Sequence, residues 1–260
     1  MAWPELDASS YESFADCLTD ADAVKDTTGS VIVLSGGEGQ GAGGAYDGDG
    51  LTLPRNTQLI GTGNPAHIIC PTTRFKAGSF TGQMLISRIV FPDGFNLQNA
   101  RNSKVELCEF QDEVLVDGPS FYNAFDTCQW QDLGASFALV TDTDGNQNAN
   151  QIINPRINCI NGIVLTSNGW NIHGGAIEGD GASDEELGVF LTLAGNNHTV
   201  MGTWFERGGD RTFATSAIHM TSVSDGCVIL GGSPGFLVDV LDEGGAIVAN
   251  KVYPPYQRAS

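Results

Sequence analysis

The amino-acid sequence predicts an all-β protein folded as a parallel β-helix with a short N-terminal capping helix. The main observation is a strand-like tetrad that recurs along the chain. Its six copies end at Phe91, Phe110, Trp130, Ile157, Ile177 and Phe205, at spacings of 19, 20, 27, 20 and 28 residues. A period in this range is typical of a solenoid, in which each repeat buries its apolar face against its neighbours.

The composition favours the same fold. The chain of 260 residues contains 34 glycines and only 17% charged residues, unlike helical repeat proteins. At this length we expect one elongated domain. Its parts are an N-terminal segment with the capping helix at 1–30, the parallel β-helix at 31–245 and an extended tail at 246–260, in which Pro254 and Pro255 disfavour a helix.

The N-terminal elements follow from hydrophobic spacing. Residues 9–25 predict the amphipathic helix, with Ser9 or Ser10 as N-cap and Phe14 and Leu18 on one face. Buried strands are expected next at 31–34 and 57–61.

Each later repeat is expected to supply two short strands. The second strand of each repeat is an apolar run, at 114–116, 137–140, 163–165 and 189–191. Apolar runs joined by glycine and asparagine turns, without helices between them, suit a coiled parallel sheet rather than a doubly wound one. Residues 31–252 would form about nine or ten coils stacked at ~4.8 Å.

Four segments carry a resemblance to known proteins. The sequence SYESFADCLTDADAVKDTTGSVIVLSGG followed by GLTLPRNTQLIGTG resembles the start of pectate-lyase-like, single-stranded right-handed β-helices. Later, NIHGGAIEGD and HTVMGTWFERGG are similar to coils of tailspike and turret-type virion surface proteins. The resemblance implies a right-handed helix and a homo-oligomer, commonly a trimer. It leaves the activity open, because the superfamily includes lyases, hydrolases, epimerases and non-catalytic viral adhesins.

The charge balance narrows the classes of partner. With 31 acidic and 12 basic residues the net charge is -19, so the surface repels nucleic acid. Such an acidic, lysine-poor surface is typical of proteins from hypersaline environments; an ordinary acidic extracellular protein is the alternative. No segment is apolar enough to span a membrane. The first residues lack the basic and apolar regions of a signal peptide.

Six cysteines are present, none in a C-x-x-C pair, which argues against a structural zinc site. Cys108 and Cys128 occupy the same repeat position, two residues before Phe110 and Trp130. We expect both to point inward as free thiols, by strand alternation.

One pair of carboxylates is the candidate catalytic site. The residue after each tetrad should face outward, and in the last two repeats it is Glu178 and Glu206. In register they would lie about 5 Å apart, as the two carboxylates of retaining glycoside hydrolases do. A polar ladder on a solvated sheet face is the alternative. No lyase-like cluster of acids with a Lys or Arg base is evident.

Exposed aromatic residues are candidates for glycan binding, because aromatic rings stack on sugars. Trp204 should point outward beside Glu206, and Trp170 and Tyr122 are expected in turns. A subunit contact is the alternative role for Trp204. The four histidines are expected at the surface or in turns.

No cofactor is expected, although one segment resembles part of a calcium loop. Asp142, Asp144 and Asn146 alternate like the first ligands of an EF-hand, but the required Gly and Glu are replaced by Gln147 and Ile153. A solvated turn is the alternative.

These observations predict a virion surface protein from a salt-adapted virus. It would be a capsid turret, spike or tail-associated adhesin that attaches to host-surface glycans and contacts other virion proteins. The alternative is a secreted polysaccharide-degrading hydrolase or lyase located outside the cell.

Overall fold

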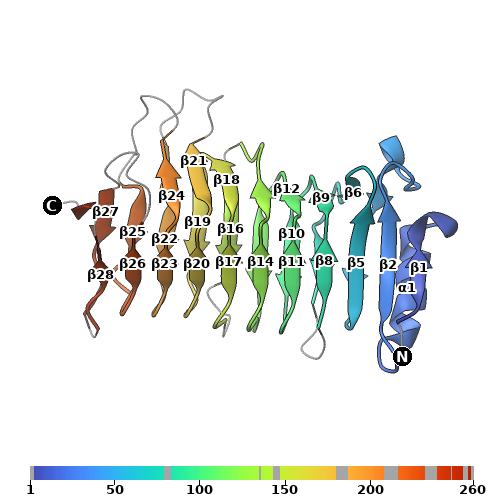
Figure 1. Ribbon diagram of the computed structural model, residues 1–260, viewed down its shortest axis with the longest axis horizontal. Coiled ribbons are helices and arrows are strands. Elements are labelled where there is room, and N and C mark those ends of the chain that lie inside the picture. The colour runs from blue at the N-terminus through green and yellow to red at the C-terminus, as the bar shows by residue number, and fades with distance from the viewer. Residues whose placement is uncertain are drawn as a thin grey trace.

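The computed structural model describes residues 3–78, 83–134, 136–142, 147–179, 187–207, 216–231, 239–246, 248–253 and 257–258. They form a parallel β-solenoid whose coils stack along one axis from the N-terminus to the C-terminus (Figure 1). Three sheets run along the rod, and all strand pairings among these residues are parallel. The predicted fold class is confirmed, and sheets of eleven, ten and eight strands agree with nine or ten coils.

The eleven-stranded sheet contains, in spatial order, β1 (Glu5–Asp7), β2 (Ser30–Ser35), β5 (Thr57–Thr62), β8 (Leu85–Ser87), β11 (Lys104–Glu106), β14 (Ala124–Asp126), β17 (Gln151–Ile153), β20 (Asn171–His173), β23 (Thr199–Met201), β26 (Val228–Leu230) and β28 (Lys251–Val252). The ten-stranded sheet contains β4 (Thr52–Leu53), β7 (Phe75–Ala77), β10 (Phe95–Gln98), β13 (Val114–Asp117), β16 (Phe137–Thr141), β19 (Asn161–Leu165), β22 (Leu191–Leu193), β25 (Ile218–Met220), β27 (Asp239–Asp242) and β29 (Gln257–Arg258). The eight-stranded sheet contains β3 (Tyr46–Asp47), β6 (Ala66–Ile69), β9 (Ile89–Phe91), β12 (Glu109–Phe110), β15 (Gln129–Trp130), β18 (Arg156–Cys159), β21 (Ala176–Gly179) and β24 (Trp204–Glu206).

The six tetrads all end in the eight-stranded sheet, as one column of inward residues. The prediction of two strands per repeat was wrong, because each complete coil has three. The missed strands are those of the eleven-stranded sheet from β8 onward, whereas β2 and β5 of the same sheet confirm the strands expected at 31–34 and 57–61. In β11, for example, only Val105 is buried, between Lys104 and Glu106, so the strand has no apolar run to reveal it.

The N-terminal end of the rod is covered by α1 (Phe14–Val24), as Figure 1 shows. Its buried face is Phe14, Cys17, Leu18 and Ala21. The predicted caps were wrong. Ser13 is the N-cap and accepts a hydrogen bond from the Asp16 amide at 3.2 Å.

Two short 3-10 helices complete the elements, η1 (Ala8–Ser10) and η2 (Ala42–Gly44). Ser9 and Ser10 belong to η1, because the carboxylate of Asp7 caps this separate turn by accepting from the Ser9 amide.

The chain ends also contribute strands to the sheets. β1 pairs with β2, so the solenoid begins within the segment expected to carry only the helix. The expected C-terminal tail contributes β28 and β29, which pair with β26 and β27. The described parts of 246–260 therefore continue the coils.

An aromatic stack fills the N-terminal half of the core. Ring centroids lie 6.1 Å apart for Phe75 and Phe91, 5.5 Å for Phe91 and Phe110, and 5.1 Å for Phe110 and Trp130. Each fully buried ring contributes about 2–3 kcal/mol to folding.

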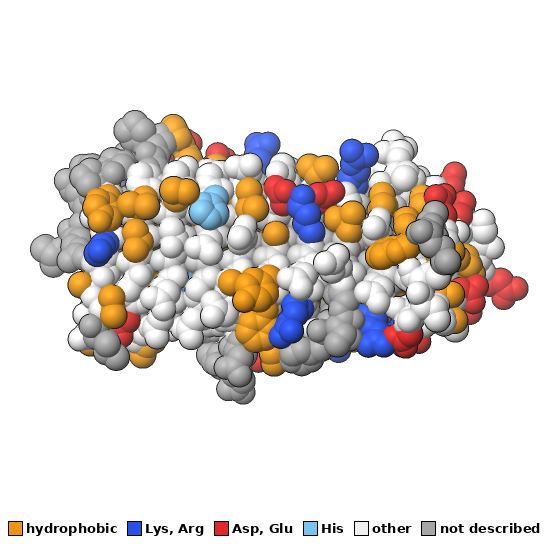
Figure 2. Space-filling view, turned by 60° about the horizontal axis from the view of Figure 1, so that its bottom comes forward, with side chains coloured by type: hydrophobic (Ala, Val, Ile, Leu, Met, Phe, Trp, Pro, Cys, Tyr) orange, Lys and Arg blue, Asp and Glu red, His pale blue; other side chains and the backbone are white. Residues whose placement is uncertain are grey.

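The space-filling view of the eleven-stranded sheet shows that its outer surface is divided (Figure 2). Charged side chains gather over its middle, whereas hydrophobic and uncharged side chains cover most of its C-terminal half. No helix among the described residues is long and apolar enough to cross a membrane.

Candidate functional site

Outward side chains of the eight-stranded sheet form two columns along the rod. Strand register places Glu109, Gln129, Arg156, Ala176 and Trp204 in one column. The second column runs beside it, and the last two register pairs are Asn158 with Glu178 and Glu178 with Glu206. We call this surface the polar strip.

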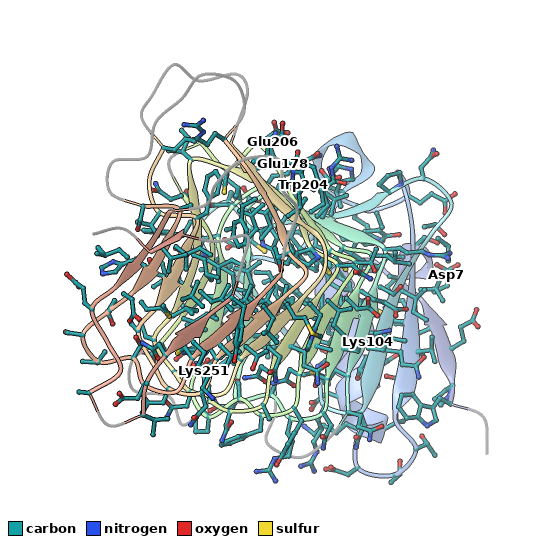
Figure 3. The ribbon with its side chains drawn as sticks, turned by 60° about the vertical axis from the view of Figure 1, so that its left-hand side comes forward. Asp7, Lys104, Glu178, Trp204, Glu206 and Lys251 are labelled. Carbon is teal, nitrogen blue, oxygen red and sulfur yellow. The ribbon has the colours of Figure 1, made fainter. Side chains whose placement is uncertain are left out.

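Glu178 on β21 and Glu206 on β24 are direct register partners, so the predicted adjacency is confirmed. Their strands are separated by about 4.8 Å, the spacing of neighbouring strands. The residues before them, Ile177 and Phe205, are buried in the core and therefore turn both carboxylates outward. Figure 3 shows both glutamates with Trp204 at the same edge of the rod.

Trp204 is 38% exposed and lies beside Glu206, as predicted. Its indole Nε1 donates a hydrogen bond to Oε2 of Glu206 at 3.1 Å. This contact orients the ring next to the carboxylates. Glu178 is half-buried and receives no side-chain hydrogen bond from the described residues. A carboxylate in this position can accept hydrogen bonds from a ligand.

Farther along the strip, glutamine side chains form hydrogen bonds within two successive coils. Nε2 of Gln111 donates to Oε1 of Glu109 at 2.7 Å, and Gln129 donates to Gln131 in the next coil. A hollow of about 210 Å³ lies near β9 and β12, lined by residues that include Arg88, Leu107 and Glu109.

This arrangement can bind a polyhydroxylated ligand. Carboxylates accept hydrogen bonds from hydroxyl groups, amide side chains both donate and accept them, and an exposed indole stacks on a sugar ring. The stacked carboxylates also have the spacing of a retaining glycosidase pair. The polar strip is the candidate site for either role.

The remaining predicted aromatic residues lie elsewhere. Tyr122 is 64% exposed, in a turn before β14 with a φ of 57°. It follows Phe121, whose ring lies 5.3 Å from the Arg101 guanidinium. This turn leads into the eleven-stranded sheet, so the structure does not bring Tyr122 together with Trp204.

The expectation that Trp170 contacts glycans from a surface turn was wrong, because the side chain is fully buried. Its Nε1 donates to Oγ of Ser167 at 2.9 Å, and its backbone amide donates to Nδ1 of His198 at 3.3 Å. Both polar groups are satisfied internally. Trp170 is therefore a core residue.

Trp170 and His198 occupy an inward column in which three other coils carry asparagine, at 123, 150 and 250. In other coils the carboxamide of Asn150 accepts the backbone amide of Asn123 at 2.9 Å, and that of Asn250 accepts the amide of Cys227 at 2.9 Å. His198 fulfils this role with Nδ1, which fixes its proton on Nε2. Nε2 is buried, and no described residue forms a hydrogen bond with it. Burial lowers the pKa of His198 to about 4, so the prediction of a surface histidine was wrong.

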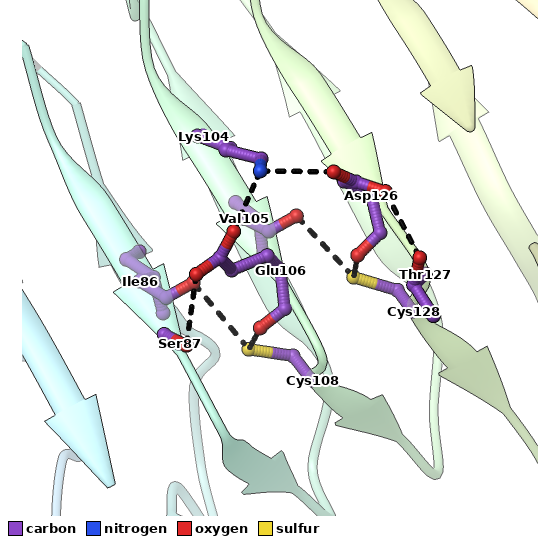
Figure 4. Close-up of polar contacts among 9 residues, drawn as sticks. All are labelled: Ile86, Ser87, Lys104, Val105, Glu106, Cys108, Asp126, Thr127 and Cys128. Carbon is purple, nitrogen blue, oxygen red and sulfur yellow. Dashed lines mark hydrogen bonds and ion pairs between the residues drawn. The ribbon is translucent and has the colours of Figure 1, made fainter. Parts of the chain in front are cut away.

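The structure also forms a cluster that sequence analysis missed. Nζ of Lys104 lies 2.6 Å from Oε2 of Glu106 and 2.9 Å from Oδ2 of Asp126 (Figure 4). Glu106 and Asp126 are register partners on β11 and β14. Glu106 and Asp126 each lie two residues before a cysteine of the repeat, Cys108 and Cys128. This shared spacing could have indicated from the sequence that the two carboxylates lie side by side.

The ammonium group of Lys104 contacts both carboxylates of this cluster. Its hydrogen bonds to Asp126 and Glu106 raise its pKa, and the bond from Lys104 lowers the pKa of Asp126. A lysine held in its charged form is a poor general base. We interpret the triad as a structural contact that neutralises two stacked carboxylates.

The cysteines are confirmed as buried free thiols. Sγ of Cys108 donates to the Glu106 carbonyl at 3.3 Å, and Sγ of Cys128 to the Val105 carbonyl at 3.4 Å. Burial raises the pKa of Cys17 and Cys70 to about 12, so their reactive thiolate forms are disfavoured.

The calcium hypothesis stays untested. Asp142 is described, whereas Asp144 and Asn146 lie outside the described residues. Among the described residues, no group of three or more His, Cys, Asp and Glu side chains could hold a metal ion.

Comparison with known proteins supports the fold. No protein-family model and no curated protein matches the chain. A solved structure titled ORF18 of Geobacillus virus E2 is similar with a TM-score of 0.56 and 11% identity; the match covers 98% of this chain and 60% of that one. This chain thus spans about three fifths of that protein's length. PfbA, a surface adhesin of Streptococcus pneumoniae, matches with a TM-score of 0.40 and 10% identity, over 92% and 91% of the two chains.

Proposed function

We propose that this chain is a virion surface protein, a turret, spike or tail-associated adhesin that binds host-surface glycans through the polar strip. The observation that carries the proposal is the grouping of Trp204, Glu178 and Glu206 on two adjacent coils. An aromatic ring beside two stacked carboxylates offers stacking and hydrogen-bond acceptors to a sugar. The similar fold of a phage protein supports the virion assignment.

The rod geometry suits a long glycan. Outward side chains repeat once per coil, at about 4.8 Å, which is close to the length of one sugar unit. A polysaccharide aligned with the rod would meet polar groups at each coil. The pectate-lyase-like ancestry and the salt-adapted virus belong to the same proposal, and the net charge of -19 supports the latter.

The test is equilibrium binding of host-type polysaccharide in molar KCl. We expect Trp204→Ala to weaken binding about tenfold or more, because a stacking partner is lost. Tyr253→Ala, at another exposed aromatic residue, is the matched control and should bind normally. Tyr122→Ala decides whether that separate turn contributes. Unchanged binding by Trp204→Ala would contradict the proposed site.

The same samples test for an enzyme. Stacked carboxylates at glycosidase spacing favour hydrolysis as the second candidate function. Product sizes measured after incubation should stay unchanged for an adhesin. Shortening that is abolished by Glu178→Gln or Glu206→Gln would instead establish catalysis by this pair.

Salt adaptation has its own measurement. If the acidic surface is adapted to salt, the melting temperature should rise from low to molar KCl, because screening reduces self-repulsion. An unchanged melting temperature would contradict this part of the proposal.

A further inference from the structure

The outer face of the eleven-stranded sheet changes character along the rod. Its middle coils carry the triad of Lys104, Glu106 and Asp126. The next coils supply segments without a single Asp, Glu, Lys or Arg, at 147–155, 166–177, 193–205 and 226–231. Each segment contains one strand of this sheet, from β17 to β26. We call the outer surface of these four strands and their adjoining turns the charge-free face.

The outward side chains on this face are apolar or neutral. One column contains Ile153, His173, Met201 and Leu230, and the other contains Gln151, Asn171, Thr199 and Val228. Met201 is 45% exposed, and Val248, whose carbonyl accepts the Gly226 amide from the next coil, is 54% exposed. In Figure 2 the C-terminal half of this surface shows mainly hydrophobic and white side chains and a histidine, between the charged cluster and a basic side chain at the end of the rod, where Lys251 of β28 pairs with Val228.

Such a surface is unexpected on a chain with 31 acidic residues and a net charge of -19. Core packing does not explain it, because inward positions of the same strands, such as Ile172 and Val200, already supply the core. Outward positions in a solvated sheet would ordinarily carry charges, as Lys104 and Glu106 do in the neighbouring coils.

We propose that the charge-free face docks against a second copy of this chain and so faces the symmetry axis of a homo-oligomer. Like-charge contacts strongly disfavour association, and each copy carries the same excess of carboxylates. In a symmetric oligomer, equivalent surfaces of the copies meet around the axis. A face without carboxylates allows this contact with the smallest electrostatic repulsion between the copies. Depletion of charge with exposed methionine is typical of interface cores.

The size of the face shows how far the contact must extend. The four strands have three residues each, so at about 3.3 Å per residue and about 4.8 Å between coils they cover roughly 200 Å². A standard interface buries about 800 Å² on each partner. The turns that adjoin these strands would therefore supply the larger part of the contact.

The experiment is the molar mass in solution, measured by light scattering and sedimentation velocity in molar KCl. We expect the unmodified chain to have the mass of two or more chains, and Met201→Glu to shift it to one chain. The control is Ile60→Glu, an apolar residue in the same outward column but in the N-terminal coils. This variant should keep the unmodified mass.

A second variant tests whether a loss of assembly is caused by misfolding. Asn171→Asp is nearly isosteric and adds one carboxylate to the face of each copy. It should weaken assembly at least tenfold while the circular dichroism spectrum and melting temperature of the dissociated chain stay those of a folded solenoid.

A single-chain mass for the unmodified protein would overturn the proposal, as would an assembly that survives both Met201→Glu and Asn171→Asp. The result does not depend on the polar strip, which belongs to a different sheet. Loss of glycan binding and loss of assembly can therefore be told apart.

Discussion

The N-terminal and C-terminal halves of the solenoid use the same coil but satisfy their polar groups differently. In the N-terminal half, the stacked carboxylates of Glu106 and Asp126 share the ammonium group of Lys104. In the C-terminal half, Glu178 and Glu206 are stacked in the same way, and the one hydrogen bond described there comes from the indole of Trp204. We call the first pair closed, because it shares a cation, and the second pair open, because the described residues form no ion pair with Glu178 or Glu206.

The same contrast appears inside the rod. The aromatic stack lies in the earlier coils, and Trp170 and His198 stand in the later ones, between the asparagine pair 123/150 and the pair of Cys227 with Asn250. Among the described residues, Nε2 of His198 is buried without a hydrogen-bond partner. The large stacked rings therefore stabilise the earlier coils, whereas the later coils carry Trp204, Glu178 and Glu206 on their surface.

The largest effect should come from the aromatic stack. Phe110→Ala removes a ring in contact with Phe91 and Trp130, and we expect a loss of about 3–5 kcal/mol in the free energy of unfolding. Phe137→Ala is the control, since Phe137 is 39% exposed and should cost well under half as much. Urea denaturation followed by tryptophan fluorescence measures both. Equal losses would contradict the assignment of the stack as the main stabilising contact.

The next effect concerns the buried histidine. Its pKa is about 4 in the folded chain and about 6.5 when unfolded, so the unfolded state binds the proton more tightly. Stability from neutral His198 is therefore fully present above about pH 6.5 and is lost progressively as pH falls toward 4, by roughly 3 kcal/mol. His198→Asn, which restores the residue type of this column, should remove that part of the pH dependence.

The comparison for His198→Asn is the change in urea midpoint between pH 7.5 and pH 4.5, with Asn150→His as the reciprocal variant. Acid titration of the carboxylates affects all variants alike. If His198→Asn and the unmodified chain lost the same stability between these two pH values, the buried imidazole would not be the acid-sensitive group.

The sequence predicted the eight-stranded sheet better than the eleven-stranded one, for a physical reason. Tetrads such as Thr127-Cys128-Gln129-Trp130 carry large inward residues at a regular spacing, and strand alternation then fixes Glu178 and Glu206 as outward neighbours. Three-residue strands such as Lys104–Glu106 bury only one side chain, so hydrophobic periodicity cannot reveal them.

Trp170 and His198 could not be placed from local sequence. Both lie among Asn and Gly residues that favour exposed turns, yet the coil turns one side chain of each such segment inward. That position is defined by the stacking of successive coils, as the hydrogen bond from Asn123 to Asn150 shows. It becomes visible only once the coils are aligned in space.

A smaller effect should follow from opening the closed carboxylate pair. Lys104→Met leaves Glu106 and Asp126 facing each other without their cation, and we expect a loss of about 1 kcal/mol, since solvent screens this half-exposed group. Lys76→Met is the control, because no ion pair of Lys76 is described. Denaturation midpoints should separate the two variants. A loss of the same size for Lys76→Met would mean that lysine removal acts only through net charge.

The smallest effect should come from the open pair and should have the opposite sign. Glu178→Gln removes one of two like charges in direct register, so we expect a gain of a few tenths of a kcal/mol at low ionic strength, which molar KCl should abolish. Asp126→Asn in the closed pair should instead destabilise, because it breaks a contact with Lys104. Thermal melting at two salt concentrations checks both signs. If Glu178→Gln also destabilised the chain in low salt, Glu178 would belong to an internal network, and the distinction between an open binding half and a closed structural half would fail.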